Sequence, residues 1–354
     1  MTEPTYMVRV GVVQAAQAFL QRSASVDRAC AYITDAGRSG VQLLAFPEGF
    51  IPAHPLWYHF LPASSPRSVE LASRLFENAV EVPGPDVDRL CDAAAKARVN
   101  VVIGVCERLP DTSGTLYNTQ LFIDDRGTLL GRHRKITPTL GERLVHTGGG
   151  GDGLAVHQTS AGRVSGLICG ENSNPLAACA LAADGTQIHV ASWPNHFAQG
   201  EHRPLELVQM VSRGVAYSMG AFVLNACGTI SSEIAEELSP DDPAAAAFLA
   251  DRSKGGGSVI VAPDSTIVAG PLAGSEEGIL SADIDLRQCV KAKHIHDYVG
   301  HYNRPDIFKL VVNRSTNNLV ERVENDAASG ISPSEAHDQM IDDGQSSTLS
   351  RSHG

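Results

Sequence analysis

The sequence predicts an α/β fold in one large domain, and three observations support this class. Short apolar runs alternate with longer segments whose apolar residues recur at helical spacing, as in strands that alternate with helices. The chain has 354 residues, 43% of them hydrophobic and 19% charged, so it can bury a sizeable core. Beyond residue 312 the chain becomes rich in Ser, Asn, Asp and Gly. We therefore expect one domain over 1–312 and a flexible extension over 313–354.

The elements of the first half follow from apolar runs and turn signals. Runs rich in Val, Leu, Ile and Phe, bounded by polar residues or glycine, predict strands at 8–13, 41–46, 101–105 and 119–124. Apolar residues at helical spacing predict helices at 25–36, 71–79 and 87–97.

The second half continues the alternation. Strands are predicted at 164–168, 188–191, 222–226, 258–262 and 279–284. A helix is predicted at 205–219, and another at 176–183. For this second helix, Asn174 is a preferred N-cap, Pro175 suits the first helical position and Gly185 marks the stop.

Three reactive side chains come where predicted buried strands end. Glu48 follows the run 41–46, Lys135 closes the segment at 133–135, and Cys169 follows the run 164–168. Functional sites of open α/β sheets gather at such strand ends. A carboxylate, an ammonium and a thiol supply a base, a cation and a nucleophile for attack on carbon multiply bonded to nitrogen or oxygen. The residues therefore predict a thiol hydrolase.

The setting of Cys169 predicts a thiolate. The thiol precedes the helix that begins at Pro175, and the positive end of a helix dipole stabilises an anion. A nearby Lys135 would act in the same direction. The thiolate is the nucleophilic form of cysteine.

Each of these residues also has a purely structural interpretation. A cysteine is often a small buried hydrophobe, a lysine is often solvated, and a glutamate after proline can cap a turn. Glu142, seven residues after Lys135, either holds Lys135 and biases the charge of Glu48 or forms a surface ion pair with Arg143. Chance produces all of these residues together much more rarely than it produces any one of them.

Six colinear segments resemble the nitrilases of the carbon-nitrogen hydrolase superfamily. They are AFPEGFIP at 45–52, HRKITPT at 133–139, GLICGEN at 166–172, QIHVASWP at 187–194, GGGSVI at 255–260 and VGHYNRPD at 299–306. Together they span about the first nine-tenths of the chain, and colinear motifs are far more specific than a single pattern.

The resemblance implies a four-layer α-β-β-α sandwich and a catalytic Glu48–Lys135–Cys169 triad, with Glu142 as the family's second glutamate. After the thiol, Glu171-Asn172 resembles the nitrilase form, whereas amidases and carbamoylases carry Asp two positions after the thiol. The residue between, Gly170, departs from the tryptophan that is usual there.

A nitrilase mechanism follows from the chemistry of these groups. Cys169 attacks the nitrile carbon, and Lys135 with the backbone N–H of Gly170 stabilises the developing charge on nitrogen. Glu48 takes the thiol proton and activates the waters that convert thioimidate to thioester and then to acid. The substrate pocket is expected to be lined by Gly170, Trp57, Tyr58, Trp193 and His196.

Neither a cofactor nor a metal is expected. The histidines at 294, 296 and 301 lack accompanying cysteines or carboxylates at a recognised ligand spacing. The expected partners are a small nitrile and water.

Two other function classes compete with a nitrilase. One is an amidase or carbamoylase using the same thioester route, and the other is a catalytically idle assembly protein. The intact set of Glu48, Lys135, Glu142 and Cys169 argues against the idle protein.

Composition and motifs indicate the partners, the cellular location and the assembly of the protein. A net charge of −12 disfavours nucleic acid or an anionic membrane as partner. No basic-then-apolar leader precedes Val8, no apolar run reaches spanning length, and seven cysteines include no CxxC pair, so a cytoplasmic location is expected. The resemblance implies a homo-oligomer, a dimer or larger spiral, paired through the helices at 177–183 and 205–219.

Overall fold

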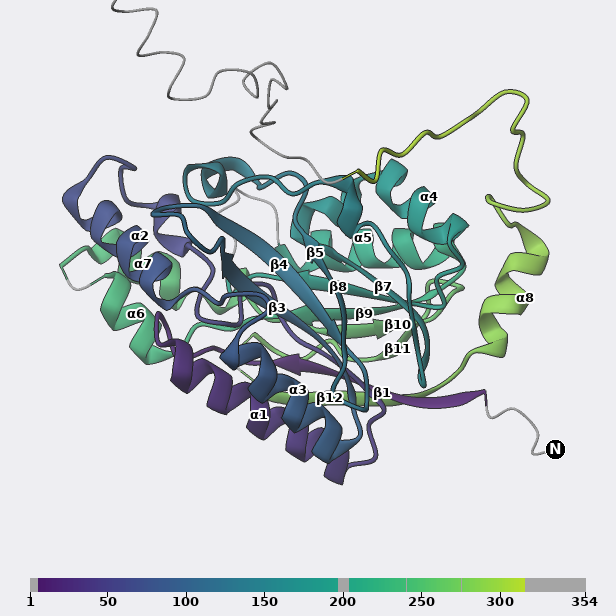
Figure 1. Cartoon of the computed structure of the whole chain (residues 1–354), viewed down its shortest axis with the longest axis horizontal. Helices are drawn as coiled ribbons and strands as arrows, with labels where there is room; N and C mark the ends of the chain where they lie inside the picture. The colour runs from purple at the N-terminus through teal and green to yellow at the C-terminus, as the bar shows by residue number, and fades with distance from the viewer. Residues whose placement is uncertain (1–5, 197–203, 240, 275, 316–354) are drawn as a thin grey trace, which may run out of the picture. The chain divides into compact units, whose positions relative to one another are not determined.

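Two six-stranded sheets form the framework of the protein (Figure 1). A computed structural model describes residues 6–196, 204–239, 241–274 and 276–315. The first sheet contains, in spatial order, β12 (Gly278–Asp285), β1 (Met7–Gln14), β2 (Leu43–Ala45), β3 (Asn100–Arg108), β4 (Leu116–Ile123) and β5 (Leu129–Arg134). The second contains β11 (Ile267–Ala269), β10 (Val259–Val261), β9 (Phe222–Cys227), β8 (Ile188–Trp193), β7 (Gly162–Ile168) and β6 (His157–Thr159).

Each sheet has a parallel centre. β1, β2 and β3 run parallel in the first sheet, as do β7, β8 and β9 in the second. The flanking pairs, such as β1 with β12 and β3 with β4, are antiparallel. The parallel strands bring their carboxyl ends to one edge of each sheet, where polar side chains can gather.

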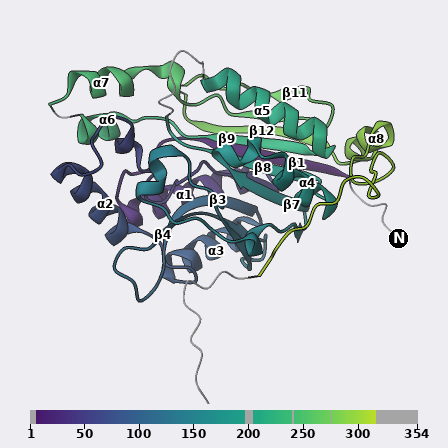
Figure 2. The ribbon, with the colours of Figure 1, turned by 90° about the horizontal axis from the view of Figure 1, so that it is seen from above.

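Helices cover the outer face of each sheet (Figure 1 and Figure 2). α1 (Arg22–Arg38) and α3 (Pro85–Ala97) pack on the first sheet, where Ile33 and Leu90 share a core cluster with Leu44. α4 (Pro175–Ala183) and α5 (Pro204–Met219) pack on the second sheet. The remaining helices are α2 (Pro66–Asn78), α6 (Ser232–Leu238), α7 (Pro243–Ala250) and α8 (Arg287–Ile295).

A third cluster fills the space between the sheets. Val10 and Val102 of the first sheet share it with Val190 and Leu224 of the second, and all four are buried. Burying each such side chain contributes about 1.5–3 kcal/mol. The predicted four-layer α-β-β-α arrangement is confirmed.

The predicted elements are present, with shifted ends. β2 has three residues where six were predicted, and β5 is half-buried along most of its length, although a buried run was expected there. β6, β11 and helices α6, α7 and α8 were not predicted. β6 and β11 are three-residue edge strands, too short to show the alternating pattern of a strand. α7 is apolar nearly all round, so its sequence shows no helical period.

Among the described residues, no helix combines the length and the apolar composition that a membrane span needs. Most of the predicted extension, residues 316–354, lies outside the described residues. The domain boundary at 312 therefore stays a prediction.

Candidate active site

The ends of β2 and β8 are joined where the two sheets meet. The backbone N–H of Glu48 donates to the carbonyl of Trp193 (3.1 Å), and Ser192 Oγ donates to the carbonyl of Phe46 (2.8 Å). Cys169 follows the neighbouring strand β7. The carboxylate and the thiol thus come from strands of different sheets whose ends are tied together.

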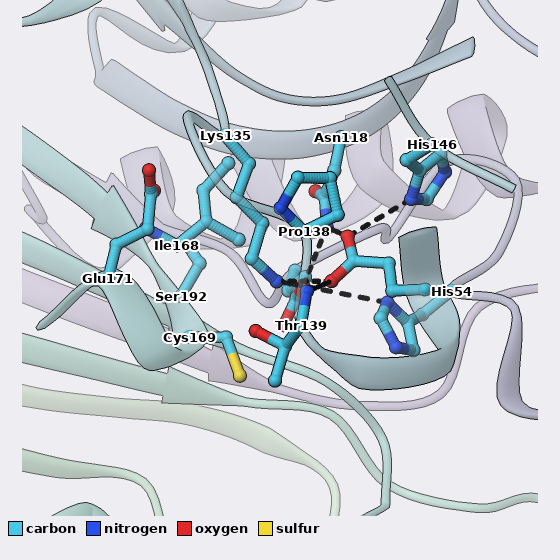
Figure 3. Close-up of polar contacts among 12 residues, drawn as sticks. His54, Asn118, Lys135, Pro138, Thr139, His146, Ile168, Cys169, Glu171 and Ser192 are labelled. Atoms are coloured by element: carbon cyan, nitrogen blue, oxygen red, sulfur yellow. Dashed lines mark hydrogen bonds and ion pairs between the residues drawn. The ribbon is translucent and has the colours of Figure 1, made fainter. Parts of the chain in front are cut away.

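Glu171 joins the segment that carries Lys135 to the segment that carries Cys169. Its Oε1 accepts a hydrogen bond from the backbone N–H of Ile136 (2.7 Å), and its Oε2 accepts one from that of Ile168 (3.0 Å). His133 Nε2 lies 2.9 Å from the same Oε2. Figure 3 shows Glu171 beside Ile168 and the Lys135 side chain. This carboxylate thereby ties the end of β5 to the turn that bears the thiol.

One ammonium lies between two carboxylates at the centre of the site. Lys135 Nζ is 2.8 Å from Glu48 Oε1 and 2.6 Å from Glu142 Oε2, and all three side chains are fully buried. Asn118 Nδ2 donates to both carboxylates, at 2.6 and 2.7 Å (Figure 3). The alternative surface ion pair of Glu142 with Arg143 is wrong, because Glu142 is buried and Arg143 Nε donates to a backbone carbonyl.

The two carboxylates differ in proton affinity. Burial, with Glu142 as a second contributor, raises the pKa of Glu48 despite the attraction of Lys135. Burial alone would raise the pKa of Glu142 too, but Lys135 and His146 outweigh it and hold that pKa below its usual range. Burial likewise opposes the charge of Lys135, yet the carboxylates keep the pKa of Lys135 well above its usual value. Glu48 is therefore the better base.

The surroundings of Cys169 favour the protonated thiol. Burial and the negative charge of Glu48 raise its pKa well above the usual value, more than Lys135 lowers it. The predicted stabilisation of a thiolate by Lys135 is present but is outweighed by these two effects. Asn174 does cap α4 as predicted, accepting from the backbone N–H of Leu176, but a short 3₁₀ turn (Cys169–Ser173) separates the thiol from that helix. A helix dipole acts only within about its first turn.

The backbone at Cys169 is strained. Its φ of 53° lies in the left-handed region, which costs a residue with a side chain about 1–2 kcal/mol. Such strain is typical of functional positions. Here the left-handed conformation changes the direction of the Cys169 side chain at the end of β7.

A cavity of about 180 Å³ opens onto these groups. Cys169, Lys135 and Glu142 line it, together with four of the predicted pocket residues: Tyr58, Gly170, Trp193 and His196. The fifth, Trp57, does not line this cavity and is buried in a separate hydrophobic cluster. Trp57 and Tyr58 both lie in a 3₁₀ turn (Leu56–His59), where consecutive side chains point about 120° apart.

Several residues of the site were not identified from the sequence. His54 lies in the loop after Glu48, and its Nδ1 is 3.5 Å from Glu48 Oε1 (Figure 3). Its Nε2 is 2.9 Å from Tyr58 OH. Burial lowers the pKa of His54 to about 3, so its imidazole is neutral. The other unpredicted residues are Asn118, Thr139 and His146. The one available signal was Asn118, a polar residue beside an apolar strand.

Among the described residues, one group has the spacing of metal ligands: Glu48, His54 and Glu142, whose ligand atoms lie within 4.8 Å of one another. The ammonium of Lys135 already lies between the two carboxylates. These residues therefore suit a buried lysine better than a metal ion.

Comparisons with known proteins agree with this geometry. Residues 9–294 match the family model described as carbon-nitrogen hydrolase. Nitrilase 2 from an unknown prokaryotic organism is 40% identical over 311 residues, covering 87% of this chain and 93% of that protein. The aliphatic nitrilase of Rhodococcus rhodochrous is 36% identical over 320 residues, covering 89% and 85%.

Solved structures share the fold. A carbon-nitrogen hydrolase from Helicobacter pylori G27 aligns with a TM-score of 0.66 at 20% identity, covering 86% of this chain and 97% of that one. An amidase from Nesterenkonia sp. aligns with a TM-score of 0.60 at 19% identity, covering 85% and 94%. The fold, the matched family model and the nitrilase relatives together show that this chain belongs to the carbon-nitrogen hydrolase family.

Proposed function

We propose that this protein is a nitrilase, which hydrolyses an organic nitrile to the carboxylic acid and ammonia. One observation carries the proposal: a buried ammonium shared by two carboxylates lies with a thiol at the wall of a small cavity. The relatives named nitrilases, at 36% and 40% identity over most of the chain, support a nitrile as the substrate.

The first step joins Cys169 to the nitrile carbon. Glu48 Oε2, which has no hydrogen-bond partner among the described residues, accepts the thiol proton as sulfur attacks. The sulfur–carbon bond forms while one carbon–nitrogen π pair moves to nitrogen. That nitrogen takes the proton from Glu48, giving a neutral thioimidate, while Lys135 and the backbone N–H of Gly170 stabilise the developing charge.

Two waters complete the reaction. Glu48 deprotonates the first water as it adds to the thioimidate carbon, and the protonated nitrogen leaves as ammonia, producing a thioester. A second water adds in the same way and expels the Cys169 sulfur, which recovers its proton. In this sequence Glu142 holds Lys135 in place.

The proposed substrate pocket is formed by Gly170, Trp193 and His196. A side chain at position 170 would meet only Thr139 Oγ1, at 3.3 Å, within 4 Å of its Cβ, so the glycine leaves space beside the thiol. The volume of about 180 Å³ favours a compact nitrile.

We further propose that the protein acts as a homo-oligomer in the cytoplasm, with no nucleic acid or membrane as partner. Large apolar side chains are exposed on α4, on α5 and in the segment after α8, among them Leu176, Met210, Tyr302 and Phe308. Such a concentration is typical of an interface. All seven cysteines are free thiols, as in a reducing compartment. Light scattering that gives a stable monomer at micromolar concentration would contradict the oligomer.

The decisive experiment measures ammonia release from a panel of nitriles and from the matching amides. The parent should release ammonia from at least one nitrile, and Cys169→Ala should release none while keeping its circular dichroism spectrum. Cys30→Ala, which removes a thiol on the opposite side of the first sheet, is the matched control and should stay active. Turnover of amides alone would make the protein an amidase.

A further inference from the structure

Behind Glu142, on the side away from the cavity, lies a second cysteine with a histidine. Cys106 of β3 has its Sγ 3.3 Å from His146 Nε2, and His146 Nδ1 is 3.0 Å from Glu142 Oε1. Cys106 and His146 are 1% and 5% exposed, and neither lines the catalytic cavity. This pair cannot reach a substrate, so any role in the reaction passes through Glu142.

The direction of these two hydrogen bonds follows from the carboxylate of Glu142. Its lowered pKa keeps it ionised, and an ionised carboxylate only accepts, so His146 Nδ1 carries the hydrogen and donates to Glu142 Oε1. Burial, with Glu107 and Glu142, raises the pKa of Cys106 well above its usual value, so the thiol keeps its hydrogen. Nε2 of the neutral imidazole then accepts the S–H of Cys106.

With the hydrogen bond from His146 Nδ1, Glu142 accepts from four donors. Its Oε1 accepts from Asn118 Nδ2 (2.7 Å) and His146 Nδ1, and its Oε2 accepts from Lys135 Nζ (2.6 Å) and the backbone N–H of Thr139 (2.8 Å). Glu48 is different, because its two described donors, Asn118 and Lys135, both bind Oε1. A carboxylate with four donors has no oxygen left for a proton, whereas Glu48 has one.

We propose that Cys106 and His146 are positioning residues that saturate Glu142 with donors and thereby leave Glu48 as the base. This inference rests on the role proposed above for Glu48. The titratable and charged groups that face the two carboxylates come from several elements: Lys135, His54, Tyr58, His146, Cys106 and Cys169.

The first test replaces His146. His146→Leu removes the Nδ1 donor, so the protonated form of Glu142 becomes relatively more stable and the carboxylate pair takes up its first proton at higher pH. The acid limb of the kcat profile should move toward higher pH, and kcat at its optimum should fall about tenfold. His146→Asn places an amide N–H near the position of Nδ1 and should restore both. The profiles are measured on whichever nitrile or amide the parent hydrolyses fastest.

The second test uses a matched pair at Cys106. Cys106→Ser keeps a donor toward His146 Nε2, whereas Cys106→Ala removes it and frees the imidazole to adopt the other tautomer. We expect the alanine variant to shift the acid limb in the same direction as His146→Leu but less, and the serine variant to resemble the parent. If both Cys106 variants and His146→Leu share the parent's acid limb, the inference is wrong.

Acid unfolding, followed by tryptophan fluorescence, gives a readout without substrate. An ionised Glu142 stabilises the fold until the pH falls through its lowered pKa. His146→Leu should therefore begin to unfold at higher pH than His146→Asn, and identical acid midpoints for the two variants would overturn the inference. A parent that hydrolyses no nitrile would overturn only the proposed function, because this comparison would still stand.

Discussion

Two clusters of buried carboxylates differ in what surrounds them. Glu107 of β3 is fully buried, and its oxygens accept from Arg132 Nη1 (2.8 Å), Arg134 Nε (3.0 Å) and Thr119 Oγ1 (2.8 Å). In the cluster formed by Glu48, Lys135 and Glu142, two carboxylates share one ammonium. The first cluster has an excess of permanent cations, and the second has an excess of carboxylates.

The difference supports the proposed roles of Glu48 as the base and of Glu107 as a structural residue. Both oxygens of Glu107 are occupied by donors, and a guanidinium cannot give up its proton at working pH, so this cluster holds strands together. Glu48 Oε2 has no hydrogen-bond partner among the described residues, and Glu48 Oε1 bonds to Lys135, which lines the cavity with Cys169. Burial alone therefore does not distinguish the proposed base; Glu48 differs from Glu107 in its unused acceptor capacity. Arg134 and Lys135 are consecutive, and the period of two along a strand directs them to opposite faces.

The sharpest test of this comparison removes the charge of each carboxylate in turn. Glu48→Gln should lower kcat by about 10²–10⁴-fold, because the proposed base is lost. Glu107→Gln should leave the kcat of the folded protein near that of the parent and lower the free energy of unfolding by about 3 kcal/mol, because two arginines lose their counter-charge. Steady-state kinetics and urea unfolding measure both. A stable but inactive Glu107→Gln would contradict the assignment.

The cations are tested by reciprocal exchange. Lys135→Arg should reduce kcat at least about a hundredfold, since a planar guanidinium cannot take the place of the ammonium between two carboxylates. Arg134→Lys should retain most activity and lose about 1 kcal/mol of stability through weaker binding to Glu107. Comparable turnover of Lys135→Arg and the parent would mean that Lys135 does not contact the transition state.

The pH dependence should separate the two carboxylates within the site. Glu48 has a raised pKa, so activity is lost as the pH falls through that raised value. Glu142 has a lowered pKa, so the stability that it contributes is present above the unfolded value of about 4.3 and is lost only at lower pH. On acidification, activity should disappear before the near-ultraviolet circular dichroism changes. Simultaneous loss of both signals would contradict this order.

A smaller effect is expected at Gly170. The Cβ of Gly170→Ala would contact only Thr139 Oγ1 at 3.3 Å, so the fold should be unchanged. Because the methyl group would enter the cavity beside the thiol, KM for the bulkiest accepted nitrile should rise by up to about tenfold. The kcat for a compact nitrile should change little. Equal KM values for parent and variant across the panel would place the substrate away from Gly170.

The smallest effect is expected from shortening the chain. Deletion of residues 331–354 should leave nitrile hydrolysis per subunit intact, because this segment lacks a sustained apolar period. Size-exclusion chromatography and ammonia release measure assembly and activity separately. Lost turnover with an unchanged size distribution would show that the tail reaches the active site and that the boundary at 312 is wrong.

Much of the fold was accessible from the sequence because its signals are local. The apolar runs placed every central strand, and Asn174-Pro175 located the start of α4. The positions of Glu48, Lys135 and Cys169 at strand ends, supported by colinear motifs, predicted three side chains that the structure brings to one site. The experiments above test the catalytic roles proposed for these side chains.

Only the tertiary structure decided the properties that depend on the whole environment of a group. Whether Cys169 is a thiol or a thiolate depends on desolvation and on every nearby charge, so the helix and Lys135 alone do not decide it. Which of Trp57 and Tyr58 faces the cavity depends on the rotation of one 3₁₀ turn. Cys106 and His146 are 40 residues apart and carry no motif, yet the fold brings them together beside Glu142. Sequence spacing reports local periodicity, whereas proton affinity and hydrogen-bond partners arise from contacts between segments that are distant along the chain.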